Sequence, residues 1–424
     1  MLFGRNPRQG FANATNLSTP ETEAATLRMI RVANDLMLEL YPDHPPHAPP
    51  PSLKSDDAST FEPDTLSLKK KQIALVWDCD ETNGLDLPPG IINSPGVGSK
   101  NGGPGTGHGA TVNIYSGAVF PGERGAPPIP QQGNVSIHVA SLTRYLPTLI
   151  PDVTFEGICL VDFESMRADW NSTTPTMHTL SVQLAGNDTK AAREQYEAAA
   201  RVYFEATIAT IRTLRPGCKI GWYGYPGGDL PHVPDTQWLD YCAAHYPLCW
   251  FDSTGSGAGY QGPGAAAMRD INDGLGWLFK LLDVITPSVY LGIAPKPPST
   301  RAVGPLATET FVGSVVREAV RLGGKAGTLV VPIIWMNYDN FWDKSINHSA
   351  PRALLTAEDA AIELGAPLRN GADGVLIWGH LDNTTSNSTN NLAAYQRFSG
   401  SVLKETVASI CANYSCCASL HGCF

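Results

Sequence analysis

The chain has 424 residues, of which 42% are hydrophobic and 17% charged, and its formal net charge is −10. This length is typical of one large globular domain or two ordinary ones. The acidic balance, with Lys69-Lys70-Lys71 as the longest basic run, argues against nucleic acid as a partner. No apolar run reaches about 18 residues, so no membrane span is expected.

Residues 1–71 have the composition of a peripheral segment. Glu21 to Leu40 has the apolar spacing of a helix, and the Pro-rich run from Pro42 to Pro51 has linker composition. The first residues, Met1-Leu2-Phe3-Gly4, begin no hydrophobic leader, so a signal peptide is not predicted from them.

Seven short apolar runs downstream have the length and composition of buried strands. They alternate with loops and helical segments, which is typical of a parallel (β/α) barrel of the TIM type, here seven-stranded and distorted. The expected strands are Gln72–Trp77, Thr111–Tyr115, Gly157–Glu164, Lys219–Pro226, Pro287–Leu291, Thr328–Asn337 and Gly374–Gly379. The expected helices are Ser136–Leu146, which Pro147 would end, Thr189–Leu214, Ala265–Asp283, Phe311–Leu322 and Ala357–Leu364. We therefore assign a barrel domain to residues 72–405.

Two acidic residues, Asp162 and Glu164, close the third expected strand. Because side chains alternate along a strand, both carboxylates point to one face, with Cα atoms about 6.6 Å apart. The C-terminal ends of the strands carry the active site in parallel α/β folds. Two acids that close cannot both ionise freely, so one is expected to hold its proton toward neutral pH, as a general acid must.

Aromatic and acidic residues gather at the other strand ends as well. Aromatic rings stack on the apolar faces of sugar rings while acids perform the chemistry, so this combination predicts a sugar-binding site. Packing of the aromatic rings in the core is the alternative interpretation. The residues at the strand ends are Asp162, Glu164, Tyr223, Tyr290, Tyr338, Asp339 and Trp378.

The first strand ends in Asp78-Cys79-Asp80-Glu81-Thr82, which resembles the first motif of haloacid-dehalogenase-type phosphatases. That resemblance would make Asp78 a nucleophile and Asp80 its acid, with magnesium as cofactor. The motif also needs a later Lys and a later acidic metal pair, and no convincing pair follows a strand. Phosphatase activity is therefore kept only as an alternative.

Nine cysteines and nine Asn-x-Ser/Thr sequons indicate an oxidising, glycosylating compartment, and hence a secreted, lysosomal or vacuolar glycoprotein. Four cysteines crowd residues 406–424, which we expect to form a small disulfide-bonded module, similar to part of an EGF-like domain. Four cysteines allow three pairings, and the sequence does not choose among them. Cys159 alternates onto the helix-facing side of its strand, where a buried, inert thiol is expected.

Several of these segments resemble hyaluronidases of glycoside hydrolase family 56. The acidic strand and its continuation, V-D-F-E-S-M-R-A-D-W from Val161, are similar to the family's I-D-W/F-E-x-W-R motif. The resemblance covers roughly residues 72–424, in order along the chain. The other matching segments are V-N-I-Y-S (Val112 to Ser116), G-W-Y-G-Y-P (Gly221 to Pro226), N-D-G-L-G-W-L (Asn272 to Leu278), P-S-V-Y-L (Pro287 to Leu291), G-A-D-G-V-L-I-W-G (Gly371 to Gly379) and the Cys-rich tail.

The resemblance implies an endo-acting β-N-acetylhexosaminidase that needs no cofactor or metal. Glu164 would be the proton donor, and Asp162 would orient the 2-acetamido group of the substrate, which attacks in place of a protein nucleophile. The family's sugar contacts fall on Tyr223, Tyr290 and Trp378, with Tyr115 at the rim and Tyr338 and Asp339 as second-line contacts. The expected partner is a polysaccharide such as hyaluronan or chondroitin, and the protein is expected to be a monomer. A catalytically silent barrel that binds glycan is the second alternative.

The sequence departs from the family pattern at several positions. Gly227-Gly228 replaces a Cys, for which a bridge between Cys242 and Cys249 could substitute, and Met166 replaces a Trp. Val315 stands where animal relatives tend to have Arg. Grooves that bind polyanions are normally lined by Arg and Lys. The departures therefore bear on the choice of substrate more than on the chemistry.

Overall fold

The computed structural model describes residues 70–79, 85–94, 111–114, 119–123, 125–226, 260, 265–291, 305–323, 327–338, 354–379, 388–420 and 423. Contacts divide the chain into two compact units, Met1–Leu66 and Ser67–Phe424, and every described residue belongs to the second. The expected N-terminal helix Glu21–Leu40 and the Pro-rich linker lie outside the described residues.

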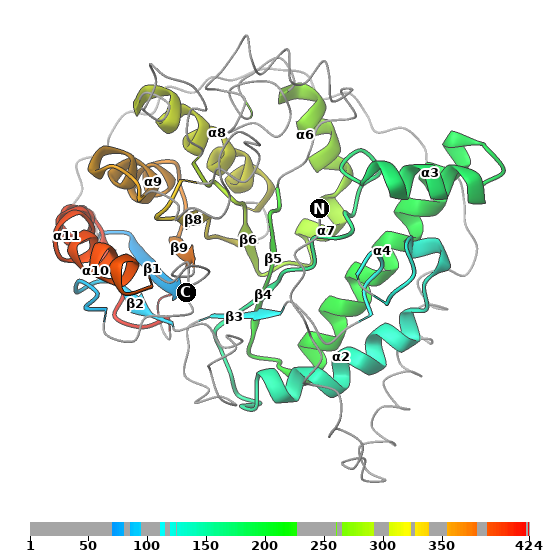
Figure 1. The fold of residues 1–424 in the computed structure, drawn as a ribbon, viewed down its shortest axis with the longest axis horizontal. Helices are drawn as coiled ribbons and strands as arrows, with labels where there is room; N and C mark the ends of the chain where they lie inside the picture. The colour runs from blue at the N-terminus through cyan, green and yellow to red at the C-terminus, as the bar shows by residue number, and fades with distance from the viewer. Residues whose placement is uncertain are drawn as a thin grey trace. The chain divides into compact units, whose positions relative to one another are not determined.

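The described strands form parallel ladders in two runs (Figure 1). The first run has the order β3-β4-β5-β6-β7, and the second has the order β8-β9-β1-β10, with β2 also paired to β1. Their bounds are β1 Gln72–Cys79, β2 Ile92–Asn93, β3 Thr111–Ile114, β4 Ile158–Val161, β5 Lys219–Tyr223, β6 Val284–Thr286, β7 Leu329–Val330, β8 Ile333–Trp335, β9 Gly374–Gly379 and β10 Ser415–Cys416.

The two runs join where β7 and β8 follow each other along the chain. Pro332 has no N–H to donate and separates the two strands. A parallel bridge from Ser288 to Ile333 links the β6 side to β8. Between β1 and β3, side chains span the gap: Thr111 N donates to Ser94 Oγ at 2.8 Å, and Asn113 Nδ2 donates to Asp78 Oδ2 at 2.8 Å.

Alternation along the strands separates a small interior core from a large outer one. Ile158 and Leu160 of β4 belong to the interior cluster, together with apolar residues of β6, β8 and β9. Cys159 and Val161 belong instead to the larger cluster shared with the helices. This division is that of a barrel of the TIM type, with a packed interior and a surrounding helical layer, as the sequence predicted.

The helices lie around the strands (Figure 1). Asn134 caps α2 by accepting from Ser136 N and Ile137 N, and Asp188 caps α4 in the same way. No helix in the described part of the chain is long and apolar enough to cross a membrane. The helices are α2 Val135–Leu149, α3 Pro175–Leu184, α4 Thr189–Leu214, α6 Ala265–Gly274, α7 Gly276–Phe279, α8 Pro305–Gly323, α9 Ala357–Arg369, α10 Ser388–Phe398 and α11 Lys404–Asn413, with a 3₁₀ turn at Pro130–Gln132 and a π-helical turn at Ser399–Leu403.

Several expected boundaries are wrong, and the strand expected at Gly157–Glu164 is only β4, Ile158–Val161. Pro147 does not end α2, which continues to Leu149, because a proline in the last turn removes one backbone bond while Leu146 and Leu149 remain buried. The strand expected at Pro287–Leu291 is instead β6, Val284–Thr286, and the predicted helix to Asp283 ends earlier, at Phe279 of α7. The apolar run there continues past the ladder, so composition alone does not place its start.

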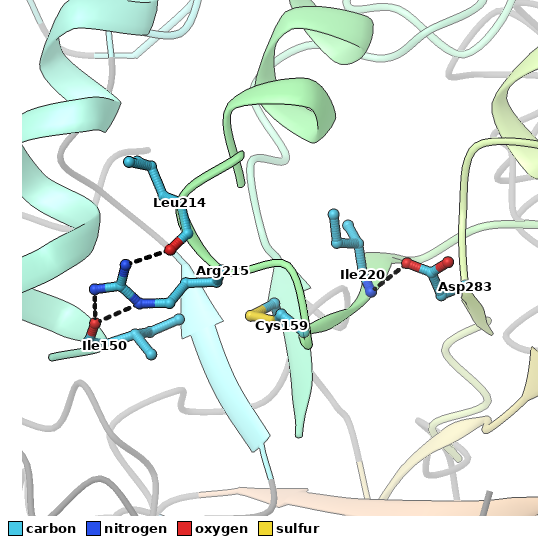
Figure 2. Close-up of a disulfide and its surroundings, with 7 residues drawn as sticks. Ile150, Cys159, Leu214, Arg215, Ile220 and Asp283 are labelled. Carbon is cyan, nitrogen blue, oxygen red and sulfur yellow. Dashed lines mark hydrogen bonds between the residues drawn. A yellow bond between two sulfur atoms is a disulfide. The ribbon is translucent and has the colours of Figure 1, made fainter. Parts of the chain in front are cut away.

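Cys159 is not the free thiol that the sequence predicted. It forms a disulfide with Cys218, whose Cα lies 6.0 Å away (Figure 2). Cys218 directly precedes β5, and the register pairs Ile158 with Lys219, so the two cysteines meet on the outer face of neighbouring strands. The alternation was predicted correctly, but the partner comes from a register between strands 59 residues apart.

The Cys-rich tail is disulfide-bonded, as predicted, and the pairs are Cys411–Cys416 and Cys417–Cys423. The tail docks beside the start of β1, where Cys417 N donates to Ile73 O at 3.0 Å. Leu420 packs against the interior cluster of the barrel. The tail therefore covers the end of the barrel at which the strands begin. Cys242 and Cys249 lie outside the described residues.

Candidate active site

The acid pair follows directly after β4. The strand ends at Val161, and Asp162 N still donates to Ile114 O of β3 at 3.1 Å. Phe163 is buried and stacks on Phe120 with ring centroids 4.9 Å apart. Asp162 continues the inward alternation of Ile158 and Leu160, so it faces the barrel axis while Phe163 faces the helices. Glu164 follows two residues later, beyond the end of the strand, and is exposed.

Burial and like charge both favour a proton on this pair. The pKa of Asp162 is raised to about 8, chiefly by burial and then by the charges of Glu164 and Glu123, with Arg167 opposing them. The pKa of Glu164 is also raised, first by the surrounding protein and then by Glu123, again against Arg167. Asp162 Oδ1 is buried and has no hydrogen-bond partner among the described residues. The arrangement holds one proton toward neutral pH, as expected for two adjacent acids.

Arg167 supplies the positive charge beside the pair. Its guanidinium lies 5.9 Å from the ring centroid of Tyr225, which is buried on the turn after β5. Tyr225 in turn accepts from Ala168 N at 2.9 Å. Gly224 has a φ of +73°, and a Cβ there would lie 3.4 Å from Arg167 Nη1. The turn after β5 therefore holds the segment that follows Glu164 in place.

An aromatic wall stands on neighbouring strand ends. Tyr223 and Tyr290 lie 6.4 Å apart between ring centroids, and Tyr290 stacks on Trp378 at 5.8 Å. Trp335 contacts both Tyr290 and Trp378, with centroids 5.8 and 5.3 Å away. Tyr223, Tyr290 and Trp378 pack against the interior cluster, so the wall forms the layer above it. Burial raises the pKa of Tyr223, which keeps its phenol neutral.

The sequence analysis missed Trp335 as a member of this wall. Trp335 has the same alternation as Ile333, an interior residue, and it pairs in register with Trp378 of β9. The signal was therefore present, since Trp335 is an inward position within an expected strand. It was overlooked because the expected strand extended to Asn337, which hid the end of the ladder.

Three further sugar contacts were predicted from the sequence: Tyr115, Tyr338 and Asp339. Tyr115 and Asp339 lie outside the described residues. Tyr338 is buried, and its hydroxyl donates to Asp359 and accepts from Thr356 N at the start of α9. These bonds account for the position of Tyr338 without a substrate, and its role as a sugar contact stays a prediction.

The carboxylate of Asp78, the nucleophile in the phosphatase alternative, is engaged by a neighbour. Asp78 is buried and accepts from Asn113 Nδ2. Asp80 lies outside the described residues. Among the residues that the structure describes, no group of three His, Cys, Asp or Glu side chains could hold a metal ion.

Together the fold and the site define a parallel (β/α) barrel with an acid pair and an aromatic wall at its mouth. A family model described as hyaluronidase, glycoside hydrolase family 56, matches residues 122–229 and 232–423. The chain belongs to this hyaluronidase family.

Relatives of known name agree with this assignment. A hyaluronidase of Apis mellifera is 28% identical over 276 residues, which are 60% of this chain and 60% of that protein. Hyaluronidase-1 of Sus scrofa is 26% identical over 280 residues, 63% of this chain and 56% of that protein. The chain thus matches about 60% of the length of these relatives.

The fold is shared with bee venom hyaluronidase. One crystal structure of that protein superposes with a TM-score of 0.57 at 21% identity, covering 79% of this chain and 99% of the other. A second, in complex with a hyaluronic acid tetramer, superposes with a TM-score of 0.54 at 24% identity, covering 71% and 87%.

Proposed function

We propose that this chain is an endo-acting glycoside hydrolase that cleaves β-N-acetylhexosaminide bonds in a glycosaminoglycan such as hyaluronan or chondroitin. The observation that carries the proposal is the placement of Asp162 and Glu164 on the inward face at the end of β4, beside an aromatic wall. Acids with raised pKa values supply the proton, and the rings supply a surface for the sugar.

Glu164 is the proton donor in this proposal. It is the more exposed member of the pair, so it can reach the oxygen of a glycosidic bond lying across the mouth. Its raised pKa keeps a population protonated toward neutral pH. Proton transfer from Glu164 to the leaving oxygen would accompany breaking of the bond to C1.

The substrate's own acetamido group is the proposed nucleophile. Asp162 and Glu164 come from one strand and lie on one side of the sugar, so Asp162 is poorly placed to attack from the other side. The acetamido oxygen would bond to C1, giving an oxazolinium ion that Asp162 stabilises. Water would then attack C1 as Glu164 takes its proton, and the ring would reopen to the acetamide. Two inversions at C1 give retention.

Tyr223, Tyr290 and Trp378 would hold the N-acetylhexosamine. They form a continuous set of rings with Trp335 above the interior core. Tyr115 is kept as a rim contact and Asp339 as a second-line contact. Tyr338, whose hydroxyl is bonded to the start of α9, is likewise kept as a second-line contact.

The choice of a glycosaminoglycan rests on the relatives, which are named hyaluronidases, and on the bee venom protein that was crystallised with a hyaluronic acid tetramer. We also propose that the protein works as a monomer in a secreted, lysosomal or vacuolar setting. Its disulfides Cys159–Cys218, Cys411–Cys416 and Cys417–Cys423 support an oxidising compartment.

The proposal is tested by incubating the protein with hyaluronan, chondroitin, chondroitin sulfate and chitin oligosaccharides and sizing the products. Internal cleavage of at least one of them, with even-numbered or mixed oligosaccharides accumulating early, is expected. Binding to a glycan without any shortening over long incubation would instead support the silent glycan-binding barrel. Release of phosphate from a chromogenic ester, dependent on magnesium, would revive the phosphatase alternative.

The mechanism is tested by NMR of the first-formed reducing sugar from a β-linked substrate. Retention predicts an initial β product, and a thiazoline mimic of the bicyclic intermediate should inhibit. An initial α product, or efficient cleavage of a 2-hydroxy analogue, would rule out the acetamido route.

A further inference from the structure

A tight turn between β3 and α2 packs against both neighbours of Glu164. Glu123 N donates to Phe120 O at 3.1 Å and Ala126 N donates to Glu123 O at 3.0 Å, which closes the turn. Phe120 stacks on Phe163, the residue before Glu164. Ser165, the residue after it, donates from Oγ to Pro121 O at 3.1 Å.

Gly122 allows this close approach. Its φ is +87°, and a Cβ there would lie 2.5 Å from Met177 Cε and 3.1 Å from Ser165 Cβ. Any other residue would therefore be strained and would push the turn away from the acid strand. The next residue along the turn is Glu123, which is half-buried. The turn thus holds Glu123, a third acidic residue, beside the segment that carries Glu164.

The charge of Glu123 acts on both members of the pair. It raises the pKa of Asp162 and that of Glu164, whereas Arg167 lowers both. The groups that face Glu164 in the described part of the chain are Asp162 on its own segment, Glu123 from the turn, Arg167 from the following segment and the neutral phenol of Tyr223 from β5. Three carboxyl groups therefore interact electrostatically with a single guanidinium, that of Arg167.

We propose that Glu123 is a positioning residue for the acid pair, whose negative charge helps the pair to keep its one proton and so extends the proton-donating form of Glu164 to higher pH. This role deepens the proposed function and rests on it. Glu123 transfers no proton itself and forms no bond to the substrate. It acts through the pair, across a turn that is fixed by Phe163 and Ser165.

The decisive readout is the pH profile of kcat/KM on the glycan that the wild-type protein cleaves. Glu123→Gln removes the charge and keeps the shape, so the midpoint of the alkaline limb should move down by about 0.5–1 pH unit. Glu123→Asp, which keeps the charge, should restore most of the wild-type midpoint. High salt should shrink the difference between wild type and Glu123→Gln, because screening weakens the field.

The matched control is Glu156→Gln, which removes one carboxylate from an exposed position just before β4, at the opposite end of the strand. It should leave the midpoint where it is. An alkaline limb unchanged in Glu123→Gln would overturn the proposal. Loss of turnover beyond about 100-fold at every pH would also overturn it, because it would place Glu123 among the catalytic groups.

A second measurement separates this proposal from the proposed function. Infrared titration of the protonated carboxyl band in the free protein, with Glu164→Gln and Asp162→Asn to assign the signal, needs no turnover. The titration midpoint of the pair should fall in Glu123→Gln, relative to wild type and Glu156→Gln. A fall in a protein that cleaves no glycan would support the role of Glu123 in proton retention and reject the hydrolase. An unchanged midpoint would reject the proposed role of Glu123 without bearing on the proposed hydrolase function.

Discussion

The aspartates at the two ends of the barrel differ in whether their carboxylate oxygens are hydrogen-bonded. At the end where the strands begin, Asp283 accepts from Ile220 N at 3.0 Å and from Arg212 at 3.0 Å (Figure 2 shows the first of these bonds). Asp373 accepts from Val330 N at 2.9 Å and pairs with Lys71 at 3.0 Å. At the mouth, Asp162 Oδ1 is buried with no hydrogen-bond partner among the described residues.

The cysteines and arginines follow the same division. The base has the Cys159–Cys218 disulfide and the buried Arg215, which donates from Nε to Ile150 O at 2.7 Å (Figure 2). Arg167 at the mouth lies instead over an aromatic ring beside two acids of raised pKa. Satisfied polar groups stabilise the base, while unsatisfied ones at the mouth retain a proton for chemistry, at a cost in stability.

The largest expected effect is a loss of activity at the mouth, in Glu164→Gln, which tests whether the acids there serve chemistry rather than stability. The amide keeps the shape but donates no acid proton, so kcat should fall by about 10²–10⁴-fold while glycan binding and the melting temperature persist. Product sizing and calorimetry check both. Glu194→Gln, at an exposed ion pair on α4, is the matched control and should retain activity. A wild-type rate in Glu164→Gln would show that Glu164 is not the proton donor.

At the base, replacing both Cys159 and Cys218 by Ser should lower the free energy of unfolding. The bridge closes a loop of 59 residues, for which chain entropy predicts about 4 kcal/mol, and a loss of about 2–4 kcal/mol is expected. Denaturant titration measures it. Replacing Cys417 and Cys423, whose sequence separation is 6, should cost less. Equal losses from the two bridges would contradict the chain-entropy account.

Asp162→Asn sharpens the comparison because it should lose activity and gain stability. The pKa of Asp162 is about 8 in the folded protein and near 3.9 when unfolded, so the folded state holds the extra proton between these values. Wild-type stability therefore falls as pH rises from about 4 to 8, and the variant escapes this loss. A gain of about 1–2 kcal/mol at pH 8 and almost none at pH 3 is expected from thermal melts. A gain independent of pH would contradict it.

The smallest effect is expected from Trp335→Phe in the aromatic wall. The smaller ring weakens the contacts with Tyr290 and Trp378, which should raise KM about 2–5-fold with a lesser change in kcat. Trp277→Phe, in the helical layer against Arg201, is the matched control and should leave KM unchanged. Equal effects of the two substitutions would mean that Trp335 only supports the fold.

Much of the fold and of the candidate site was predictable because it depends on short-range pattern. Four helices and most strands were expected near where the structure has them, although the helix expected at Ala265–Asp283 is two, α6 and α7. Alternation predicted that Asp162 and Glu164 share one face. The start of β6 and the end of α2 were not predicted, since Val284 and Leu149 follow from packing rather than composition. Disulfide bonding of the tail was expected because four cysteines crowd it, but the pairing came only from the structure.

The sequence by itself thus determined the class of fold, the acid pair and the aromatic residues at the strand ends, because strand periodicity has only two faces and residue type decides which of them is polar. Tertiary structure alone decided which residues meet across strands. Cys218 reaches Cys159 through the β4–β5 register, Trp335 joins Trp378 through the β8–β9 register, and Glu123 reaches Glu164 through a glycine turn. Such contacts are fixed by register and by close packing between segments far apart in the chain, and no local pattern encodes either.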